Sequence, residues 1–169
     1  MDTIPAPRRV EPPDFADERT ALDAWLDYYR ATLLVKCAGL SFEQLKRRAV
    51  PPSNLSLLGV LRHMTRVEQT WFEVRFAGQD VERYYQSRDA EFNDLDGDPL
   101  DVVHANFLRA CARSREVAGR HSLDERVTKV EGDADVDLRW IYVHMIEEYA
   151  RHCGHADFLR ECIDGATGD

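Results

Sequence analysis

The sequence has no apolar run near the roughly 20 residues that a helix needs to span a bilayer. It also lacks an excess of positive charge, because 22 Lys and Arg face 31 Asp and Glu and the formal net charge is −9. Nucleic-acid binding depends on cationic side chains that displace counterions from phosphates. We therefore expect neither a membrane nor a nucleic acid as a partner.

Cysteine is scarce, and no two cysteines form a C-x-x-C pair. A chain of 169 residues that is 44% hydrophobic can fill a core without a disulfide framework, so we expect reduced thiols. Cys153 directly follows His152, but adjacent helical side chains point about 100° apart, so His152 is poorly aimed to take its proton. No catalytic residue is assigned from the sequence.

A glycine-rich phosphate loop, internal repeats and low-complexity tracts are also absent. Residues 1–15 are rich in proline and charge and have no apolar signal-peptide region, so we expect a flexible N-terminal arm on a soluble, cytoplasmic protein. Residues 16–169 are long enough for one well-filled core and short for two. A single domain is expected there.

Four segments show the 3.6-residue apolar period of amphipathic helices. Ser41 to Gln44 form a capping box that opens a short helical turn after the first helix. Pro99 suits the first position of the third helix, with Asp98 as its cap. The expected helices cover residues 17–38, 53–78, 99–119 and 138–164, and either Ser53 or Ser56 caps the second.

The connections after the second and third helices are long. Residues 79–98 are acidic and irregular, and a loop of this length is often functional. In the other connection, residues 126–131 are expected to be extended. Four helices with long crossings predict an all-α four-helix bundle whose site lies between facing helices.

The last helical segment places His144, Glu148 and His152 at successive i, i+4 steps, with His155 close behind. A rotation of about 100° per residue puts Glu148 and His152 within or at the edge of the apolar stripe. A buried carboxylate needs a partner, a proton or a metal ion. A slightly rotated helix would make both residues ordinary surface-edge groups, so this segment alone leaves both interpretations open.

His63 supplies a second observation. It lies at the margin of the apolar stripe of residues 53–78, so it points toward the bundle interior or a cleft between helices. A lone histidine in such a place is more often a core residue with its hydrogen bonds made than a metal ligand. Together with Glu148 and His152, however, it completes a two-histidine, one-carboxylate set that leaves coordination positions open on Zn²⁺, Fe²⁺, Ni²⁺ or Mn²⁺.

Two long segments, AVPPSNLSLLGVLRHMTRVEQTWF and LRWIYVHMIEEYARHCGHADFLRECIDGATG, resemble the DinB-like superfamily in its mycothiol-dependent branch. WLDYYRATLLVKCAGL is similar too, so the resemblance covers nearly the whole chain beyond the arm. It implies a four-helix bundle that holds a divalent metal ion with His63, Glu148 and His152. Many relatives have histidine in place of Glu148, which keeps His144 and His155 as alternative ligands.

The resemblance implies a metal-dependent thiol transferase, with mycothiol as cosubstrate, a small electrophile as acceptor and, as in many relatives, a homodimer. A bound cation lowers the pKa of a thiol ligand because it stabilises the thiolate. Two other classes fit the same residues. A metal-dependent hydrolase or isomerase would show activity without thiol, and a non-catalytic small-molecule or stress-response binding protein would bind metal weakly or only structurally.

Other side chains near the expected ligands are left outside the site. Guanidinium groups suit a carboxylate on a thiol cosubstrate, but each nearby arginine is also explained as a helix-face charge beside a glutamate. Trp71 and Trp140 are candidates to line a pocket, although aromatics at helical spacing are more often core residues. The arginines that flank the ligand helices are Arg62, Arg66, Arg139 and Arg151.

Overall fold

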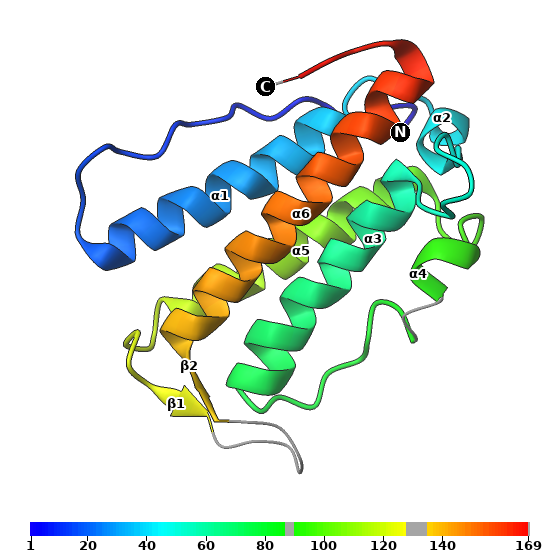
Figure 1. Cartoon of the computed structure of the whole chain (residues 1–169). Helices are drawn as coiled ribbons and strands as arrows, with labels where there is room; N and C mark the ends of the chain where they lie inside the picture. Colours follow the sequence, from blue (N-terminus) through cyan, green and yellow to red (C-terminus); the bar gives the residue numbers. More distant parts are fainter. Residues whose placement is uncertain (87–89, 128–134, 169) are drawn as a thin grey trace.

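The computed structural model describes residues 1–86, 90–127 and 135–168. Within these residues, four long helical elements pack as a bundle (Figure 1). The prediction of an all-α four-helix bundle is confirmed. The elements are α1 (Glu18–Cys37), α3 (Leu57–Glu68) with the π-helix η1 (Gln69–Phe76) directly after it, α5 (Leu100–Ala118) and α6 (Leu138–Asp164).

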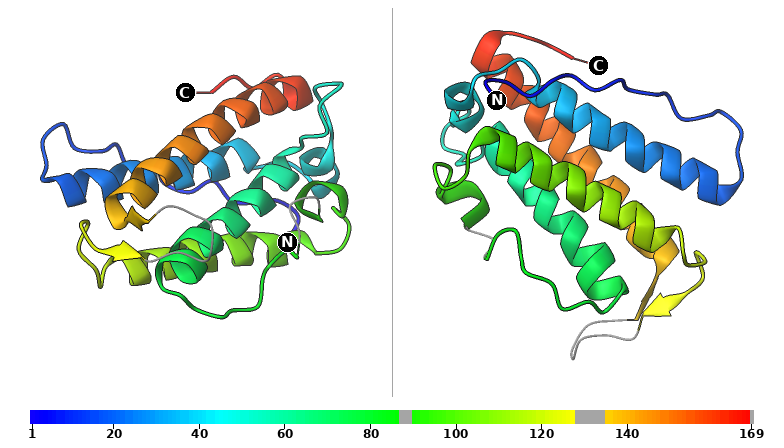
Figure 2. Two further views of the ribbon diagram at one scale, coloured as in Figure 1. Left: turned by 60° about the horizontal axis from the view of Figure 1, so that its bottom comes forward. Right: turned by 180° about the vertical axis from the view of Figure 1, so that it is seen from behind.

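The long helices pair across the bundle. α1 lies along α6, while α3 lies along α5 and also contacts α6 (Figures 1 and 2). Long connections join α3 to α5 and α5 to α6, as the sequence predicts. Side chains from all the long elements meet in one apolar core, among them Leu33, Leu61, Phe72, Phe107 and Met145.

Local signals determine where several helices begin and end. The Asp17 carboxylate accepts a hydrogen bond from a first-turn backbone amide at 3.0 Å and caps α1. Ser41 and Gln44 form the predicted capping box at α2 (Phe42–Lys46). Gly165 ends α6 with a φ of 78°, in the left-handed region that glycine enters at little steric cost.

The sequence predicts one α-helix that is capped at Ser53 or Ser56 and ends at Gly78. Ser56 is the cap, because its side chain accepts a backbone hydrogen bond, and α3 begins at Leu57. At Gln69 the backbone changes to a π-helix, and the Gln69 amide group hydrogen-bonds the backbone of the following loop. π-Helical turns are rare in proteins, and those that occur often lie at functional sites.

The predicted start of α5 is also wrong. Pro99 rather than Asp98 is the N-cap residue, with a ψ of 151° and no side-chain cap. The Asp98 carboxylate instead lies 3.9 Å from the Arg62 guanidinium. The preceding connection, predicted to be irregular, contains the short helix α4 (Ala90–Asn93), which carries Glu91.

The connection between α5 and α6 holds a short antiparallel ribbon of β1 (Arg126–Val127) and β2 (Val136–Asp137). Its first strand agrees with the extended backbone predicted there, and residues 128–131 of that prediction lie outside the described residues. Asp137 then caps α6, because its carboxylate accepts a hydrogen bond from the Trp140 amide at 2.8 Å.

The N-terminal segment, residues 1–15, runs beside α1 without forming a helix (Figure 1). Ile4 anchors it, because its side chain is 1% exposed and its backbone bridges to Ala38. The flexibility of this arm, and the single domain over residues 16–169, stay predictions. No helix of the described residues is both long and apolar enough to cross a membrane.

Candidate functional site

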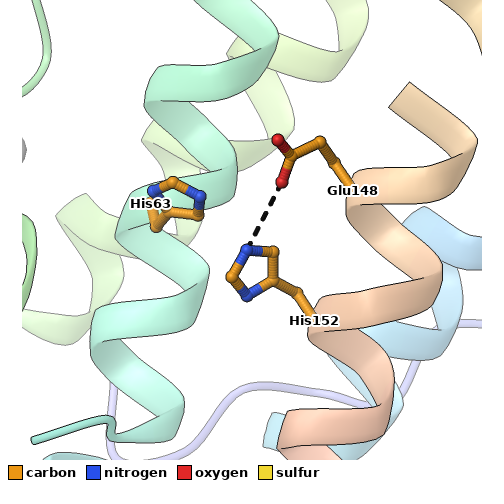
Figure 3. Close-up of side chains that lie close together, drawn as sticks. All are labelled: His63, Glu148 and His152. Atoms are coloured by element: carbon orange, nitrogen blue, oxygen red, sulfur yellow. Dashed lines mark ion pairs between the residues drawn. The ribbon is translucent and has the colours of Figure 1, made fainter. Parts of the chain in front are cut away.

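α3 and α6 bring His63 to face Glu148 and His152 (Figure 3). The two histidines are buried and Glu148 is partly buried. Glu148 and His152 lie one turn apart on α6, with Oε2 and Nε2 separated by 3.5 Å. One possible ligand atom from each of the three side chains lies within 4.8 Å of the other two. The structure therefore brings together the three residues that the sequence indicates.

This donor set suits a divalent metal ion. Ligands bound to Zn²⁺ at about 2.1 Å in a tetrahedral arrangement lie about 3.4 Å apart. The 3.5 Å between Glu148 Oε2 and His152 Nε2 is close to that separation. The His63 and His152 ring centroids are 4.6 Å apart, so small side-chain rotations would complete a three-ligand centre. Such a centre leaves coordination positions open for a reactant.

Glu91, which no sequence pattern singled out, sets the orientation of His63. Its side chain is fully buried, and its Oε2 lies 2.7 Å from His63 Nδ1. Its other oxygen contacts the Arg66 guanidinium, one turn further along α3. A carboxylate at Nδ1 keeps the proton on that nitrogen and leaves Nε2 with its lone pair. Figure 3 shows one His63 ring nitrogen directed toward Glu148 and His152.

A glycine allows α4 to lie close to α3. A Cβ atom at Gly59 would meet the Phe92 ring at 2.8 Å, so a larger residue would push α4 away. Phe92 in turn packs on His63, with ring centroids 5.6 Å apart. The Arg48 guanidinium donates a hydrogen bond to the Phe92 carbonyl at 3.2 Å. These contacts hold Glu91 in place beside His63.

A buried polar network ties the helices together behind the site. Arg30 of α1 donates to both Glu68 carboxylate oxygens, at 2.7 and 2.8 Å, and the Tyr149 hydroxyl of α6 donates to one of them at 2.7 Å. Burial acts to raise the pKa of Glu68, but the Arg30 charge and these hydrogen bonds outweigh it, so the pKa lies below its usual value. The network joins α3 to α6 next to the turns that carry the candidate ligands.

The two alternative ligands lie on either side of the central three. His144 Nε2 is 3.5 Å from Glu148 Oε1, and His155 Nδ1 is 3.4 Å from His152 Nδ1. In the described part of the chain, Glu148 alone groups with both His63 and His152 at ligand distances. Glu148 therefore stays the third candidate ligand.

The candidate ligands line a cavity of about 690 Å³. Trp71 of η1 and His144 form part of its wall, with ring centroids 4.5 Å apart. Two of the arginines that flank the ligand helices lie elsewhere: Arg62 covers the ring of Tyr85, and Arg139 pairs with acidic residues of other segments. The arginines that line the cavity are Arg66, Arg75 and Arg151.

The cysteines are all free, as the sequence predicts, and three of them are buried. The Cys153 thiol lies 3.8 Å from the Tyr29 carbonyl of α1. Burial raises the pKa of Cys153 to about 12, and it does the same for Cys37 and Cys111. Such thiols stay protonated at neutral pH, so none of these three is placed to act as a nucleophile.

A known protein family matches most of the chain. The sequence model of the mycothiol-S-transferase family matches residues 21–165, a range that includes the three candidate ligands and Glu91. No match was found among curated proteins. The family match confirms the resemblance to the mycothiol-dependent branch of DinB-like proteins. Because it spans most of the chain, the protein belongs to the mycothiol-S-transferase family.

Proposed function

We propose that the protein is a metal-dependent thiol S-transferase that joins mycothiol to a small electrophile. Membership of the mycothiol-S-transferase family supports the transferase chemistry and the thiol. The observation that carries the metal dependence is the convergence of His63, Glu148 and His152 from two helices. They meet beside a cavity of about 690 Å³, which is large enough for a small molecule.

His63, Glu148 and His152 would hold the ion, and Glu91 would keep His63 in the tautomer that presents Nε2. When bound, a divalent cation lowers the pKa of a thiol ligand, so that a thiolate forms at neutral pH. In the proposed transfer, the thiol sulfur bonds to the electrophilic carbon, a leaving group departs with its electron pair, and the thiol proton passes to solvent. The helices of the bundle would hold the thiol and the electrophile in an orientation that brings sulfur and carbon together.

The first test is metal content and thiol transfer, measured on protein without an affinity tag. The purified protein should contain a divalent metal and should speed the conjugation of mycothiol with 1-chloro-2,4-dinitrobenzene. Chelation should abolish this rate, and added metal should restore it. A full rate in chelated protein would exclude the metal role. Turnover of an electrophile without thiol would favour a hydrolase or isomerase, and metal binding without turnover would favour a binding protein.

The second test concerns His152 as a ligand. A metal ion that binds only the folded state adds about 2.7 kcal/mol at a hundredfold excess over Kd, so it raises the melting temperature. His152→Ala should remove that rise, whereas the matched control His155→Ala should retain it. An equal metal-induced rise in both variants would remove His152 from the ligand set.

A further inference from the structure

Arginine side chains gather at the cavity that holds the candidate metal ligands. Arg66, Arg75 and Arg151 all line it, and its described lining includes one carboxylate, that of Glu148. Two of the three guanidinium groups already contact a carboxylate, because Arg66 pairs with Glu91 and Arg151 pairs with Glu147. Within a chain of formal charge −9, the cavity is therefore a place where cationic hydrogen-bond donors gather beside a space for a ligand.

Arg66 is anchored on the cavity wall. Its Nε contacts the buried Glu91 carboxylate, and its side chain is 23% exposed. The contact through Nε fixes the guanidinium beside His63. A guanidinium held in this way presents the planar fork that binds carboxylates with two parallel hydrogen bonds.

Arg75 adds a second cation next to an aromatic surface. Its guanidinium lies over the Trp71 ring, 4.5 Å from the centroid. Trp71 contacts His144, which stacks on Trp140 with centroids 5.0 Å apart and ring planes 15° apart. The Trp71 and His144 rings therefore form part of the cavity wall, with the Arg75 guanidinium over Trp71. Such a wall fits a flat unsaturated group, and the cation fits an acidic substituent on it.

Arg151 is the third cation that lines the cavity, and it is exposed. It pairs with Glu147 one turn earlier on α6, and its side chain is 55% exposed. Exposed ion pairs of this kind contribute little to stability. Arg151 can therefore leave Glu147 and pair with a ligand anion at a small cost in free energy. It can then turn toward a bound acid at the cavity mouth.

From these contacts we infer that the electrophilic substrate is a planar acid, in which a carboxylate is attached to the flat group that bears the reactive carbon. The carboxylate binds the arginines, and the flat group lies against the wall formed by Trp71 and His144. The reactive carbon then faces the candidate ligands His63, Glu148 and His152. This inference rests on the proposed transferase function for the chemistry, but the anion site itself is testable without turnover.

The binding test uses two unreactive molecules of similar shape, 4-methylbenzoate and 4-methylbenzamide, titrated calorimetrically into chelator-treated protein. Without a metal ion, the carboxylate can gain affinity only from the chain. The acid should bind about tenfold or more tightly than the amide, as expected for hydrogen bonds to a charged group. Arg66→Gln and Arg75→Gln should each reduce this preference, whereas Arg120→Gln, an exposed arginine at the end of α5, should retain it. Equal affinities, or a preference that survives in the Arg66→Gln/Arg75→Gln/Arg151→Gln triple variant, would overturn the inference.

The reactivity test uses 4-(bromomethyl)benzoate and 4-(bromomethyl)benzamide with mycothiol and metal-loaded protein. In each reaction the sulfur–carbon bond forms, the carbon–bromine bond breaks, bromide leaves and the thiol proton passes to solvent. After the uncatalysed rate is subtracted, kcat/KM should favour the acid about tenfold. Equal catalysed rates would overturn the inference and leave the transferase function standing. Arginine-dependent binding of 4-methylbenzoate without any catalysed conjugation would support the anion site and contradict the transferase function.

Discussion

Replacement of Glu91 with glutamine should weaken metal binding by about 10- to 100-fold, the usual effect of losing a group that orients a ligand histidine. That range corresponds to about 1.4–2.8 kcal/mol of binding free energy. Glu91 is fully buried, lies 2.7 Å from His63 Nδ1 and contacts Arg66. Glutamine keeps the length of the side chain and can still accept a hydrogen bond from Nδ1–H. The substitution removes the negative charge that keeps the proton on His63 Nδ1 and that balances the charge of Arg66.

The assay is competition for zinc against a chromogenic chelator, with protein that has no affinity tag. The melting temperature of the metal-free protein, measured alongside, separates a loss of fold from a loss of affinity. The metal-induced rise in melting temperature should shrink in Glu91→Gln, because stabilisation follows metal affinity. Glu43→Gln is the matched control, since Glu43 is an exposed carboxylate that pairs with Lys46 far from the ligands.

If Glu91→Gln keeps the parent zinc affinity and the metal-free protein melts as the parent does, Glu91 does not orient His63. Glu91→Asp gives a second check, because it retains the charge and shortens the reach by one methylene. If charge is what matters, its zinc affinity should lie between those of the parent and Glu91→Gln.

Glu148, Glu68 and the cysteines each allow a further test. Glu148→Ala should lose bound metal in elemental analysis, whereas Glu148→His should retain it with a preference shifted toward softer ions; equal metal content in parent and both variants would remove Glu148 from the ligand set. The pKa of Glu68 is lowered in the folded protein, so its contribution to stability is fully present above its ordinary value of 4.5 and is lost as the pH falls through the folded value. In Glu68→Gln, the unfolding free energy measured in urea should therefore depend less on pH at acidic pH than it does in the parent. The variant should also lose about 3–5 kcal/mol of unfolding free energy at neutral pH, because the Arg30 charge stays buried. A thiol-reactive dye at neutral pH should label Cys162 in the native protein and all four cysteines after unfolding, and rapid native labelling of a second thiol would contradict the burial of the others.

Helix boundaries set by neighbouring residues were predictable from the sequence. α1 and α6 begin and end within a residue of their predicted limits, because Asp17 and Gly165 act within a single turn. The inward direction of His63, Glu148 and His152 was predictable for a related reason. A helix has a fixed rotation per residue, so the apolar stripe of α3 or α6 reports which of its other side chains face the interior. Their role as metal ligands stays a prediction.

The contacts that complete the site were not predictable, because they depend on residues far apart in the chain. α4 has four residues and no apolar period, and it is held by the fit of Phe92 against Gly59 rather than by its own sequence. No pattern in the sequence around Glu91 therefore indicated its contact with His63, a residue 28 positions away.

The number of long helices, most of their limits and the faces that carry the candidate ligands depend on interactions within a few turns of one helix, so they could be predicted from the sequence. Other features depend on how the helices pack: Glu91 reaches His63, Arg30 neutralises Glu68 across 38 positions, and Arg75 and Trp71 of η1 line the ligand cavity. A buried charge is tolerated only where another helix brings its partner, and no local pattern records where that partner lies.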